Sequence, residues 1–400
     1  MSADSEVLVL GGGVAGLATA CFLADRGVAV TLLEKRGEPG GRAFSYREPK
    51  SGLEIDNGQH VFLGCCTELI GFLGRIGSLK EANLQARAEV PFLAPDGRLG
   101  WIREGALPAP AHCLPSLLAY PHLSFSERLS VAAAGRRRAA ADAGTLAGWE
   151  ALSFADLLKR LGQSPRAVTR FWEPIIVSAA NDALENVDAA LAARLVREGL
   201  FADRAGARFG ISRVGLSDLI ARPAARSLEA NGGRIRTGFS VERIVVEGGR
   251  VAGVRSGDGT ILYADRYVSA LAWDDLLAVL PPEVSAAEPF SRAAGLKPSP
   301  ILGIHLWLDR FVKDLEFVGL LESPLHWVFN QTRIRQGRGT GDKGRETGQY
   351  LSLIISGAHE WVEKPASEIA GMVMGELARF FPAARGAGLT HSVVLKEKKA

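Results

Sequence analysis

The first part of the chain alternates between short apolar runs and breaks that contain glycine. Residues 6–10 and 28–33 are runs rich in Val and Leu, and residues 17–26 between them carry a helical pattern that Gly27 ends. Short continuous apolar runs are typical of parallel strands that are buried on both faces. The order of strand, helix and strand predicts a βαβ unit at the start of an α/β fold.

Apolar segments return in the second half of the chain. Residues 240–246, 250–256 and 260–270 are separated by turns that contain glycine, and they predict a three-stranded meander. Residues 301–308 and 325–329 are two further apolar segments, and each contains a Trp. Such segments either line a cavity for a long hydrocarbon or belong to an ordinary core.

The length of 400 residues exceeds what one core usually fills, so we expect two domains. The segment after residue 85 interrupts the first fold before the meander begins. We therefore predict an α/β protein with a Rossmann-like domain formed by residues 1–85 and 231–295. An α+β substrate domain, formed by residues 86–230 and 296–391, is inserted into it.

A glycine motif joins the first predicted strand to the first predicted helix. The residues after the strand read Gly-Gly-Gly-Val-Ala-Gly, which is the GxGxxG pattern of dinucleotide-binding folds. Gly11 permits a tight turn, Gly13 lets the backbone approach a pyrophosphate, and Gly16 allows the helix to pack closely on the strand. Val14 and Ala15 begin the helix, whose positive N-terminal end faces the phosphates.

Glu34 follows the second predicted strand, where such folds bind a ribose. Its carboxylate can accept hydrogen bonds from ribose hydroxyls and would repel a 2′-phosphate, which argues against NADP. The loop, helix, strand and acid together predict a dinucleotide site. The simpler interpretation is a glycine-rich turn in an ordinary doubly wound domain.

The residues after Glu34 favour FAD over NAD. Lys35 leads to Gly40, Gly41 and Arg42, and an acid followed by a Gly-Gly-Arg turn resembles the FAD-binding signature of the flavin amine oxidase and carotenoid desaturase superfamily. The resemblance implies that Lys35 and Gly41 lie at the cofactor and that Arg42 offers its guanidinium to the pyrophosphate. The alternative for Arg42 is an ordinary surface position.

Two further segments resemble the same superfamily. Residues 56–60, with the sequence Asp-Asn-Gly-Gln-His, are similar to its D-x-G-x-H segment, which lies near the flavin ring, so Gly58 is expected at the cofactor. The backbone of Val241, at the start of the meander, is implied to contact the adenine. The alternatives for the first segment are a polar loop and a structural role for His60.

Several segments go beyond the superfamily signature. They are residues 41–46, 56–64, 115–118, 121–124 and 171–174, together with Asn181. These segments resemble the hydroxysqualene dehydroxylase family, the squalene-associated FAD enzymes of bacterial hopanoid synthesis, and the resemblance covers essentially the whole chain. It implies an FAD-dependent oxidoreductase that converts hydroxysqualene to squalene by reductive dehydroxylation.

The C-terminal end departs from that family. Its members continue with a further strand, a Gly-Asp turn and a helix that complete the flavin site. This sequence ends at Ala400, shortly after the strand-like residues 392–395. We therefore expect a C-terminally truncated chain that lacks the final FAD segment.

Reductive dehydroxylation requires an acid that helps the hydroxyl group to leave. Glu173 lies between Trp172 and Pro174, and a carboxyl group in an apolar wall has a raised pKa and stays protonated. Glu173 is therefore the first candidate for the proton donor, and His60 is the alternative. The simpler interpretation of Glu173 is a position on the surface of a helix.

The sequence leaves two other functions open. One is another FAD-dependent isoprenoid desaturase, or an amine oxidase, on the same fold. The other belongs to a different class and is a non-catalytic escort protein that binds prenyl lipids. The intact glycine loop, Glu34 and Arg42 argue against an escort protein.

Charge and composition argue against several classes. The net charge of +3 is small and no basic stripe with interleaved aromatic residues occurs, so nucleic-acid binding is not expected. The seven His residues are scattered without ligand spacing, so no metal is expected. The four Cys residues include no CxxC pair, which fits reduced thiols in the cytoplasm.

An apolar segment followed by arginines indicates a contact with lipid. Residues 107–134 are rich in Leu, Pro and Ala, and Arg136, Arg137 and Arg138 follow them. The combination predicts either a peripheral contact with an anionic membrane or a buried helix with a solvated basic end. We expect a cytoplasmic protein, peripheral on the inner membrane under the first alternative, with an isoprenoid lipid as its partner.

Overall fold

The structure is a computed structural model, and it describes residues 6–139, 148–149, 152–335 and 348–400. The chain forms two compact units. The first comprises residues 1–46, 69–81 and 214–297, and the second comprises residues 47–68, 82–213 and 298–400.

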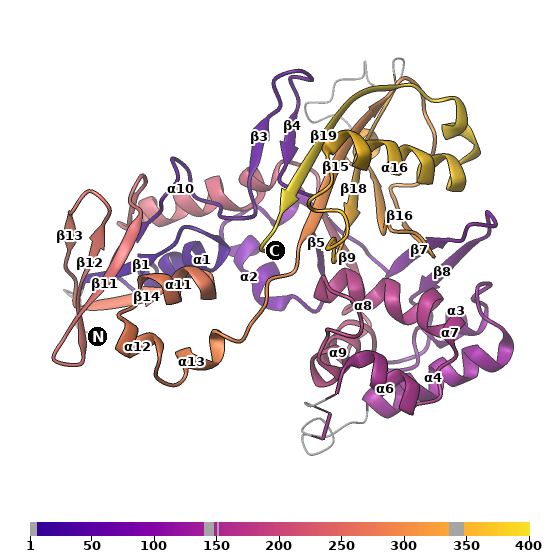
Figure 1. Cartoon of the computed structure of the whole chain (residues 1–400), viewed down its shortest axis with the longest axis horizontal. Helices are drawn as coiled ribbons and strands as arrows, with labels where there is room; N and C mark the ends of the chain where they lie inside the picture. The colour runs from indigo at the N-terminus through magenta and orange to yellow at the C-terminus, as the bar shows by residue number, and fades with distance from the viewer. Residues whose placement is uncertain (1–5, 140–147, 150–151, 336–347) are drawn as a thin grey trace. The chain divides into compact units, whose positions relative to one another are not determined.

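The first unit is built on a four-stranded parallel sheet (Figure 1). Its strands, in spatial order, are β10 (Arg234–Arg236), β2 (Ala29–Leu33), β1 (Glu6–Leu10) and β14 (Arg266–Ser269). The side chains of β1 after Glu6 are all buried, as expected for a central parallel strand. The predicted βαβ unit is confirmed, because helix α1 (Val14–Ala24) connects β1 to β2.

Helices pack on this sheet. Besides α1, the described helical segments of the first unit are η1 (Leu79–Glu81), η4 (Ser217–Ala221), α10 (Arg222–Ala230), α11 (Trp273–Val279), α12 (Pro282–Ser285), α13 (Phe290–Ala293) and most of α2 (Thr67–Arg75). Helix α10 packs against α1, where the Sγ atom of Cys21 lies 3.4 Å from the carbonyl oxygen of Ala224. Segments that are about two hundred residues apart therefore share one layer.

The predicted meander is present, but its third strand is divided. Strands β11 (Val241–Glu247), β12 (Arg250–Ser256) and β13 (Ile261–Leu262) form an antiparallel sheet, whereas β14 pairs with β1 in the parallel sheet. The Tyr267 hydroxyl accepts a hydrogen bond from Ala264 N and donates one to the Ala252 carbonyl, which fixes the break. The prediction of one strand over residues 260–270 was wrong, because apolar alternation does not show which partner each part pairs with.

The second unit contains a seven-stranded sheet. Its strands, in spatial order, are β19 (Leu389–Glu397), β15 (Ile301–Leu308), β18 (Gln349–Ile355), β17 (Trp327–Asn330), β16 (Phe317–Leu320), β7 (Glu89–Leu93) and β8 (Leu99–Arg103). A smaller antiparallel sheet holds β5 (Val61–Leu63), β9 (Phe209–Ser212) and β6 (Ala82–Leu84). Strands β3 (Ser45–Arg47) and β4 (Glu54–Asp56) pair where the chain enters this unit.

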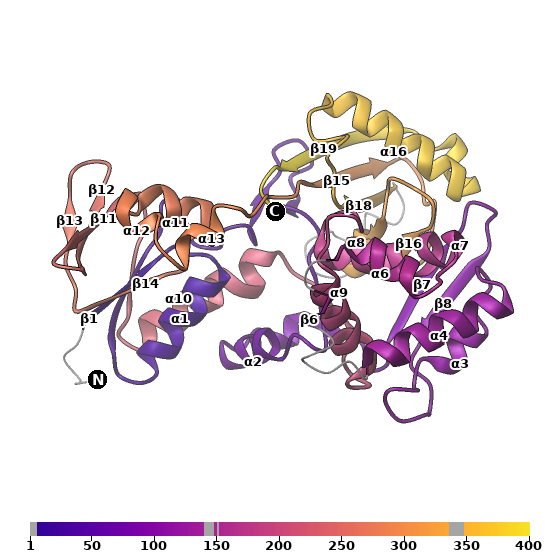
Figure 2. The same ribbon diagram turned by 60° about the horizontal axis from the view of Figure 1, so that its bottom comes forward.

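Helices form two separate cores in the second unit (Figure 2). Helix α16 (Ala366–Phe380) packs on one face of the large sheet, where Leu302, Ile304 and Leu306 of β15 are buried. The other core lies among the remaining helices: α3 (Leu114–Leu118), α4 (Phe125–Ala139), α6 (Phe154–Arg160), α7 (Pro165–Ala167), η2 (Val168–Trp172), α8 (Glu173–Ala180), α9 (Ala189–Val196) and η3 (Arg197–Phe201). Two short segments, α14 (Gln331–Ile334) and η5 (Pro382–Gly386), complete the unit.

The fold class predicted from the sequence, a Rossmann-like domain with an inserted α+β domain, is confirmed. Besides shifts of a few residues at other boundaries, the observed units differ from the predicted domains in two segments. Residues 47–68 lie in the second unit, because residues 56–60 pack on β15. Residues 214–230 lie in the first unit, because α10 packs on α1. Among the described residues, no helix has the length and apolar character needed to cross a membrane.

Candidate functional site

The glycine loop of the first unit has a geometry that few other residues would permit. Gly11 has a φ angle of +101°, in the region that favours glycine. A Cβ atom added to Gly16 would stand 1.9 Å from the Gly11 carbonyl oxygen, whereas one added to Gly13 would meet no atom within 4 Å. The tight turn at Gly11 and the close packing at Gly16 are therefore present as predicted, and Gly13 borders open space.

The N-terminal end of α1 has no side-chain cap. Gly13 is its N-cap residue and has no side chain, so no side-chain oxygen accepts from the first turn, which begins with Val14 and Ala15. The backbone N–H groups of this turn and the dipole of the eleven-residue helix remain available to a negative group. This is the arrangement that holds a pyrophosphate in dinucleotide-binding folds.

Glu34 connects the glycine loop to the loop that follows β2. Its buried side chain accepts a hydrogen bond at Oε2 from Gly12 N, at 2.9 Å, and another at Oε1 from Arg36 N, at 2.8 Å. Each carboxylate oxygen can accept more than one hydrogen bond, so ribose hydroxyls can still bind.

The Gly-Gly-Arg loop touches the glycine loop. A Cβ atom added to Gly41 would lie 3.0 Å from Gly13 Cα, so a larger residue at position 41 would push the two loops apart. The Nη1 atom of Arg36 donates to the Gly41 carbonyl at 2.9 Å, and its guanidinium lies 5.1 Å from the centre of the Phe44 ring. Arg36 thus fixes this loop, a role that the sequence analysis missed.

A pocket of about 310 Å³ opens beside this loop. It is lined by Arg36, Glu38, Pro39, Gly41, Phe44, Ser45 and Ser217. Ser45 N donates to Ser217 Oγ at 2.9 Å, and Ser217 N donates to Ser45 Oγ at 3.1 Å. This reciprocal pair joins segments that are 172 residues apart, and no sequence pattern links them.

Three other predicted cofactor residues of the first unit lie at or near its surface. The Nζ atom of Lys35 lies 3.5 Å from Asp275 Oδ2, and both side chains are exposed. Arg42 is exposed as well. Val241 is half-buried and packs against the core of the meander. The positions of Arg42 and Val241 therefore leave their predicted cofactor contacts as predictions. Lys35 lies beside the acidic Asp275.

The segment of residues 56–60, which includes the predicted cofactor residue Gly58, is held within the second unit by β15. A Cβ atom added to Gly303 would lie 3.0 Å from Gly58 Cα, and His305 Nε2 donates to the Asp56 carbonyl at 3.0 Å. The Asp56 carboxylate forms a buried ion pair with Arg335. Neither His305 nor Arg335 was predicted, because both lie more than 240 residues away along the sequence.

His305 is neutral in the folded protein. Burial lowers its pKa to about 4, and its Nδ1 atom accepts a hydrogen bond from the Tyr350 hydroxyl at 2.8 Å. On the same strand the Trp307 ring stacks on Tyr350, with 4.6 Å between ring centres, and on His391, with 4.9 Å. One face of the large sheet is therefore aromatic, while the other face packs on α16.

The two predicted proton donors lie in different surroundings. Glu173 begins α8 and is half-buried, and burial, helped by the charge of Glu185, raises the pKa of its carboxyl group. Within the described part of the chain, the Glu173 carboxylate forms no hydrogen bond or ion pair. His60 is exposed, and its Nδ1 atom donates to the Gly58 carbonyl at 2.9 Å. No hydrogen bond between described residues joins Glu173 to His60.

Comparisons with known proteins agree with the geometry of the first unit. The family of flavin containing amine oxidoreductases matches residues 14–396. The 15-cis-phytoene desaturase of Narcissus pseudonarcissus is 25% identical over 399 residues, which cover 98% of this chain and 68% of that protein. The hydroxysqualene dehydroxylase of Rhodopseudomonas palustris is 26% identical over 408 residues, which cover 99% of this chain and 86% of that protein. A crystal structure of an oxidoreductase from Methanosarcina mazei has a TM-score of 0.75 at 21% identity, and the match covers 98% of this chain and 88% of that one.

This chain belongs to the flavin containing amine oxidoreductase family. It is a flavin-dependent oxidoreductase whose cofactor is FAD. The residues of the first unit fit that cofactor, because the uncapped helix and the open space at Gly13 suit a pyrophosphate and Glu34 suits a ribose.

Proposed function

We propose that this protein uses FAD to reduce hydroxysqualene to squalene with release of water. The observation that carries the proposal is Glu173, a half-buried carboxyl group with a raised pKa and no partner among the described residues. The relative named hydroxysqualene dehydroxylase supports the proposal, because the match is 26% identical and covers 86% of that protein.

The reaction needs an acid because hydroxide is a poor leaving group. A protonated Glu173 can give its proton to the hydroxyl oxygen, so that the carbon–oxygen bond breaks with loss of water. The leaving group is allylic, and the resulting cation is delocalised. Reduced FAD supplies the hydride that completes the reduction. Apolar neighbours must keep bulk water away from the cation, and the buried Trp172 and Ile176 lie beside Glu173 in η2 and α8.

The main rival is desaturation of an isoprenoid chain, since several relatives are named phytoene desaturase. Removal of hydrogen from a hydrocarbon requires no protonation of a leaving group. A carboxyl group with a raised pKa is therefore more useful as a proton donor for dehydroxylation than for desaturation. A non-catalytic escort protein would need neither Glu173 nor the FAD loop.

The test uses the full chain loaded with FAD. The protein is reduced anaerobically with dithionite and incubated with hydroxysqualene, and squalene is measured by gas chromatography. We expect the Glu173→Gln variant to lose at least about 100-fold in rate, as is typical for removal of a general acid. Full turnover by this variant would remove Glu173 from the reaction.

Glu185 provides a matched control, because its charge contributes to the raised pKa of Glu173. Glu185→Gln removes that charge and lowers the pKa of Glu173, so the rate should begin to fall at a lower pH than in the parent protein. The maximal rate at low pH should stay the same. Formation of a more unsaturated product from phytoene, with no squalene from hydroxysqualene, would favour the desaturase.

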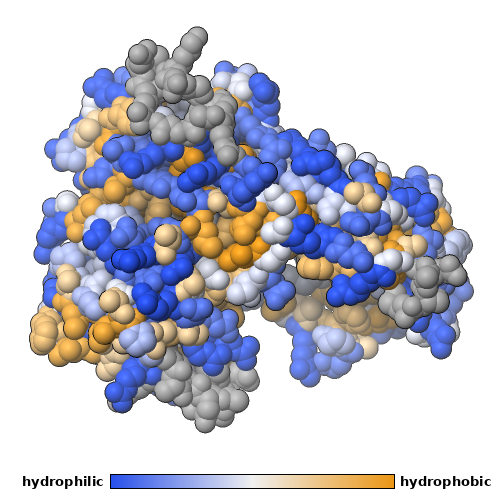
Figure 3. Space-filling view, turned by 180° about the vertical axis from the view of Figure 1, so that it is seen from behind, coloured by the Kyte–Doolittle hydropathy of each residue, from blue (hydrophilic) through white to orange (hydrophobic). Residues whose placement is uncertain are grey.

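We also propose a peripheral contact with an anionic membrane through the outer face of α4, which would place the protein on the cytoplasmic side of the inner membrane. Phe125 is 66% exposed and Leu129, one turn later, is 48% exposed. Arg136 is exposed on the same face, and the side chains of Arg137 and Arg138 lie outside the described residues. Apolar residues gather on the surface over the α3 and α4 region, at the lower left of the view in Figure 3.

Sedimentation with vesicles tests this contact. Replacing Arg136, Arg137 and Arg138 with Ala should reduce the fraction that sediments with phosphatidylglycerol vesicles, because each arginine near an anionic surface adds about 1 kcal/mol. Arg310→Ala is the control, since Arg310 is an exposed arginine of the same unit that is already paired with Asp309. Equal sedimentation of the parent and the triple variant would leave the basic cluster as a solvated helix end.

A further inference from the structure

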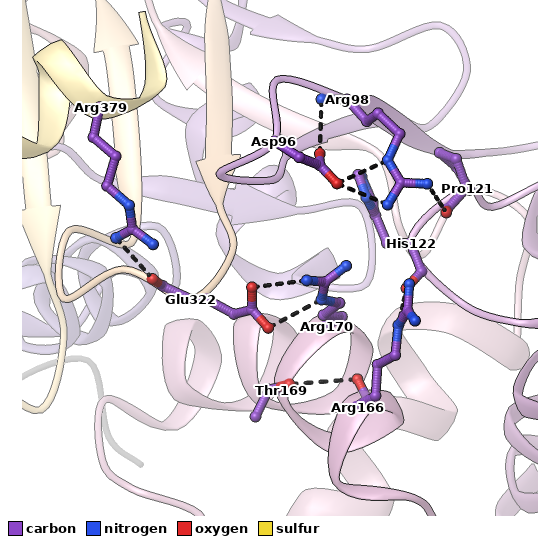
Figure 4. Close-up of polar contacts among 9 residues, drawn as sticks. All are labelled: Asp96, Arg98, Pro121, His122, Arg166, Thr169, Arg170, Glu322 and Arg379. Carbon is purple, nitrogen blue, oxygen red and sulfur yellow. Dashed lines mark hydrogen bonds and ion pairs between the residues drawn. The ribbon is translucent and has the colours of Figure 1, made fainter.

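Three arginines from separate segments of the second unit line one surface pocket (Figure 4). The pocket has a volume of about 520 Å³ and is lined by Arg98, Pro165, Arg166, Thr169, Arg170 and Glu322. Arg98 lies in the turn between β7 and β8, Arg166 lies in α7, and Arg170 lies in η2. The proposed reaction and the FAD loops use none of these residues.

Two carboxylates hold two of the arginines. Asp96 accepts from Arg98 Nε at 2.9 Å, and this hydrogen bond keeps the pKa of Asp96 at about 2, so the carboxyl group is ionised. Glu322 accepts from Arg170 through both of its oxygens, at 3.0 Å from Nε and at 2.9 Å from Nη2. The second arrangement is a bidentate pair, the geometry in which arginine also binds phosphate.

Positive charge and donors remain after these pairs are formed. Arg166 donates from Nε to the His122 carbonyl at 3.0 Å; it forms no ion pair with a described carboxylate, although its charge helps to lower the pKa of nearby Glu127. The Nη1 atom of Arg170 likewise has no partner among the described residues. The residues that line the pocket thus include three guanidinium groups and one carboxylate, that of Glu322, so the lining has a net positive charge and unused N–H groups.

Glu322 is held in a backbone conformation that only a few non-glycine residues adopt. Its φ angle is +54°, and its carbonyl oxygen accepts a hydrogen bond from Arg379 Nη1 at 3.3 Å. A left-handed glutamate persists only where its surroundings hold it there. In this conformation its carboxylate faces Arg170.

We propose that this pocket binds the phosphate group of a phosphate ester, with Arg98, Arg166 and Arg170 as its ligands and with Glu322 as an internal anion that the phosphate displaces. A carboxylate offers two oxygens in one plane, whereas a phosphate offers terminal oxygens in several directions. Three guanidinium groups that come from different segments match the second pattern. The phosphate belongs either to a lipid headgroup or to a soluble compound.

The position of the pocket is compatible with both sources. Arg98 and Arg166 donate to the carbonyl oxygens of Pro121 and His122, a few residues before the exposed Phe125. A headgroup bound here would therefore lie near an apolar side chain that can enter a bilayer. A soluble phosphate would use the arginines alone.

The experiment uses the full chain saturated with FAD, so that the cofactor's own pyrophosphate site is filled. Sodium diphosphate is titrated in by calorimetry, while the flavin absorbance shows that FAD stays bound. We expect saturable binding that weakens about tenfold or more in Arg166→Ala and Arg170→Ala, because each removes charge-assisted hydrogen bonds. Glu322→Gln, which removes the competing charge and keeps the side-chain size, should bind several-fold more tightly. Arg310→Ala, an exposed arginine of the same unit outside the pocket, should bind like the parent.

Vesicles distinguish the two sources. If the source is a lipid headgroup, phosphatidylcholine vesicles that contain phosphatidic acid bind the parent protein, bind Arg166→Ala less well, and are displaced by diphosphate. If the source is soluble, diphosphate binding depends on Arg166 and Arg170 in the same way, and vesicle binding does not. The proposal is overturned if Arg166→Ala and Arg170→Ala bind diphosphate as the parent does, or if neither the parent nor Glu322→Gln shows saturable binding of either probe. Squalene formation plays no part in these readouts, so failure here is separate from failure of the proposed reaction.

Discussion

The two units build their sites from different parts of the polypeptide. In the first unit the backbone makes the site: Gly11, Gly13 and Gly16 shape one loop, and Gly41 lets a second loop approach it. In the second unit side chains from distant segments make it, as in the ion pair of Asp56 with Arg335, which are 279 residues apart. A site made from one local stretch of backbone can be recognised from a short motif, whereas a site made from distant side chains requires the fold.

The largest effect is expected in the glycine loop of the first unit. Gly16→Ala places a Cβ atom 1.9 Å from the Gly11 carbonyl oxygen, and neither backbone can move without breaking the turn. We expect a loss of stability on the order of 5 kcal/mol, comparable to the whole stability of a small domain, and no bound FAD. Purified protein is examined by flavin absorbance and thermal unfolding.

Gly13→Ala is the matched control for that variant. An added Cβ meets no atom within 4 Å, and the φ angle of Gly13 is −70°, which alanine adopts easily. The protein without FAD should keep its stability within about 0.5 kcal/mol, while FAD should bind more weakly because the methyl group occupies the path of the pyrophosphate. Equal FAD affinity of Gly13→Ala and the parent would contradict the role of Gly13.

The next effect concerns the buried ion pair of the second unit. Asp56→Asn removes the negative charge from the buried ion pair with Arg335 and should cost about 3–5 kcal/mol. Urea unfolding followed by Trp fluorescence measures this loss. The signal reports mainly on the second unit, because six of the seven Trp residues lie there and only Trp273 lies in the first unit. Asp309→Asn breaks an exposed pair with Arg310 and should cost at most about 1 kcal/mol. Similar losses in both variants would mean that burial does not set the cost.

A smaller effect is expected from pH. Burial lowers the pKa of His305 to about 4 from 6.5, so the unfolded chain takes up the proton at a higher pH than the folded protein does. Above pH 6.5 this histidine does not lower the free energy of unfolding. As the pH falls from 6.5 toward 4, the free energy of unfolding decreases by up to about 3 kcal/mol. His305→Gln should flatten this part of the pH–stability curve. Burial also lowers the pKa of His326 to about 4, so His326→Gln measures the separate contribution of that residue.

The smallest effects are expected on FAD binding, and they differ between two neighbouring residues of the cofactor loop. Glu34→Ala removes a buried carboxylate that accepts from Gly12 and Arg36, and it should weaken FAD binding by about 1.5–3 kcal/mol. Lys35→Ala removes an exposed charge that pairs with Asp275, and it should change FAD binding by less than about 0.5 kcal/mol. Flavin retention during dilution compares the two, and an equal loss in both would contradict the difference in burial.

The sequence by itself determined the α/β class, the βαβ unit and the loop that suits FAD. These features depend on residues that are close in the chain, and a Cβ atom at position 16 is excluded by a carbonyl only five residues away. The sequence also predicted a raised pKa for Glu173, but its causes, burial and the charge of Glu185, depend on the fold.

Only the tertiary structure decided the rest. The strand predicted over residues 260–270 is divided because one part pairs with β12 and the other with β1. The ion pair of Asp56 with Arg335 and the arginine pocket around Arg170 also appear only in the fold. Each is made from segments that are distant in sequence, and local patterns carry no information on which distant segments meet, because that choice is set by the packing of the whole core.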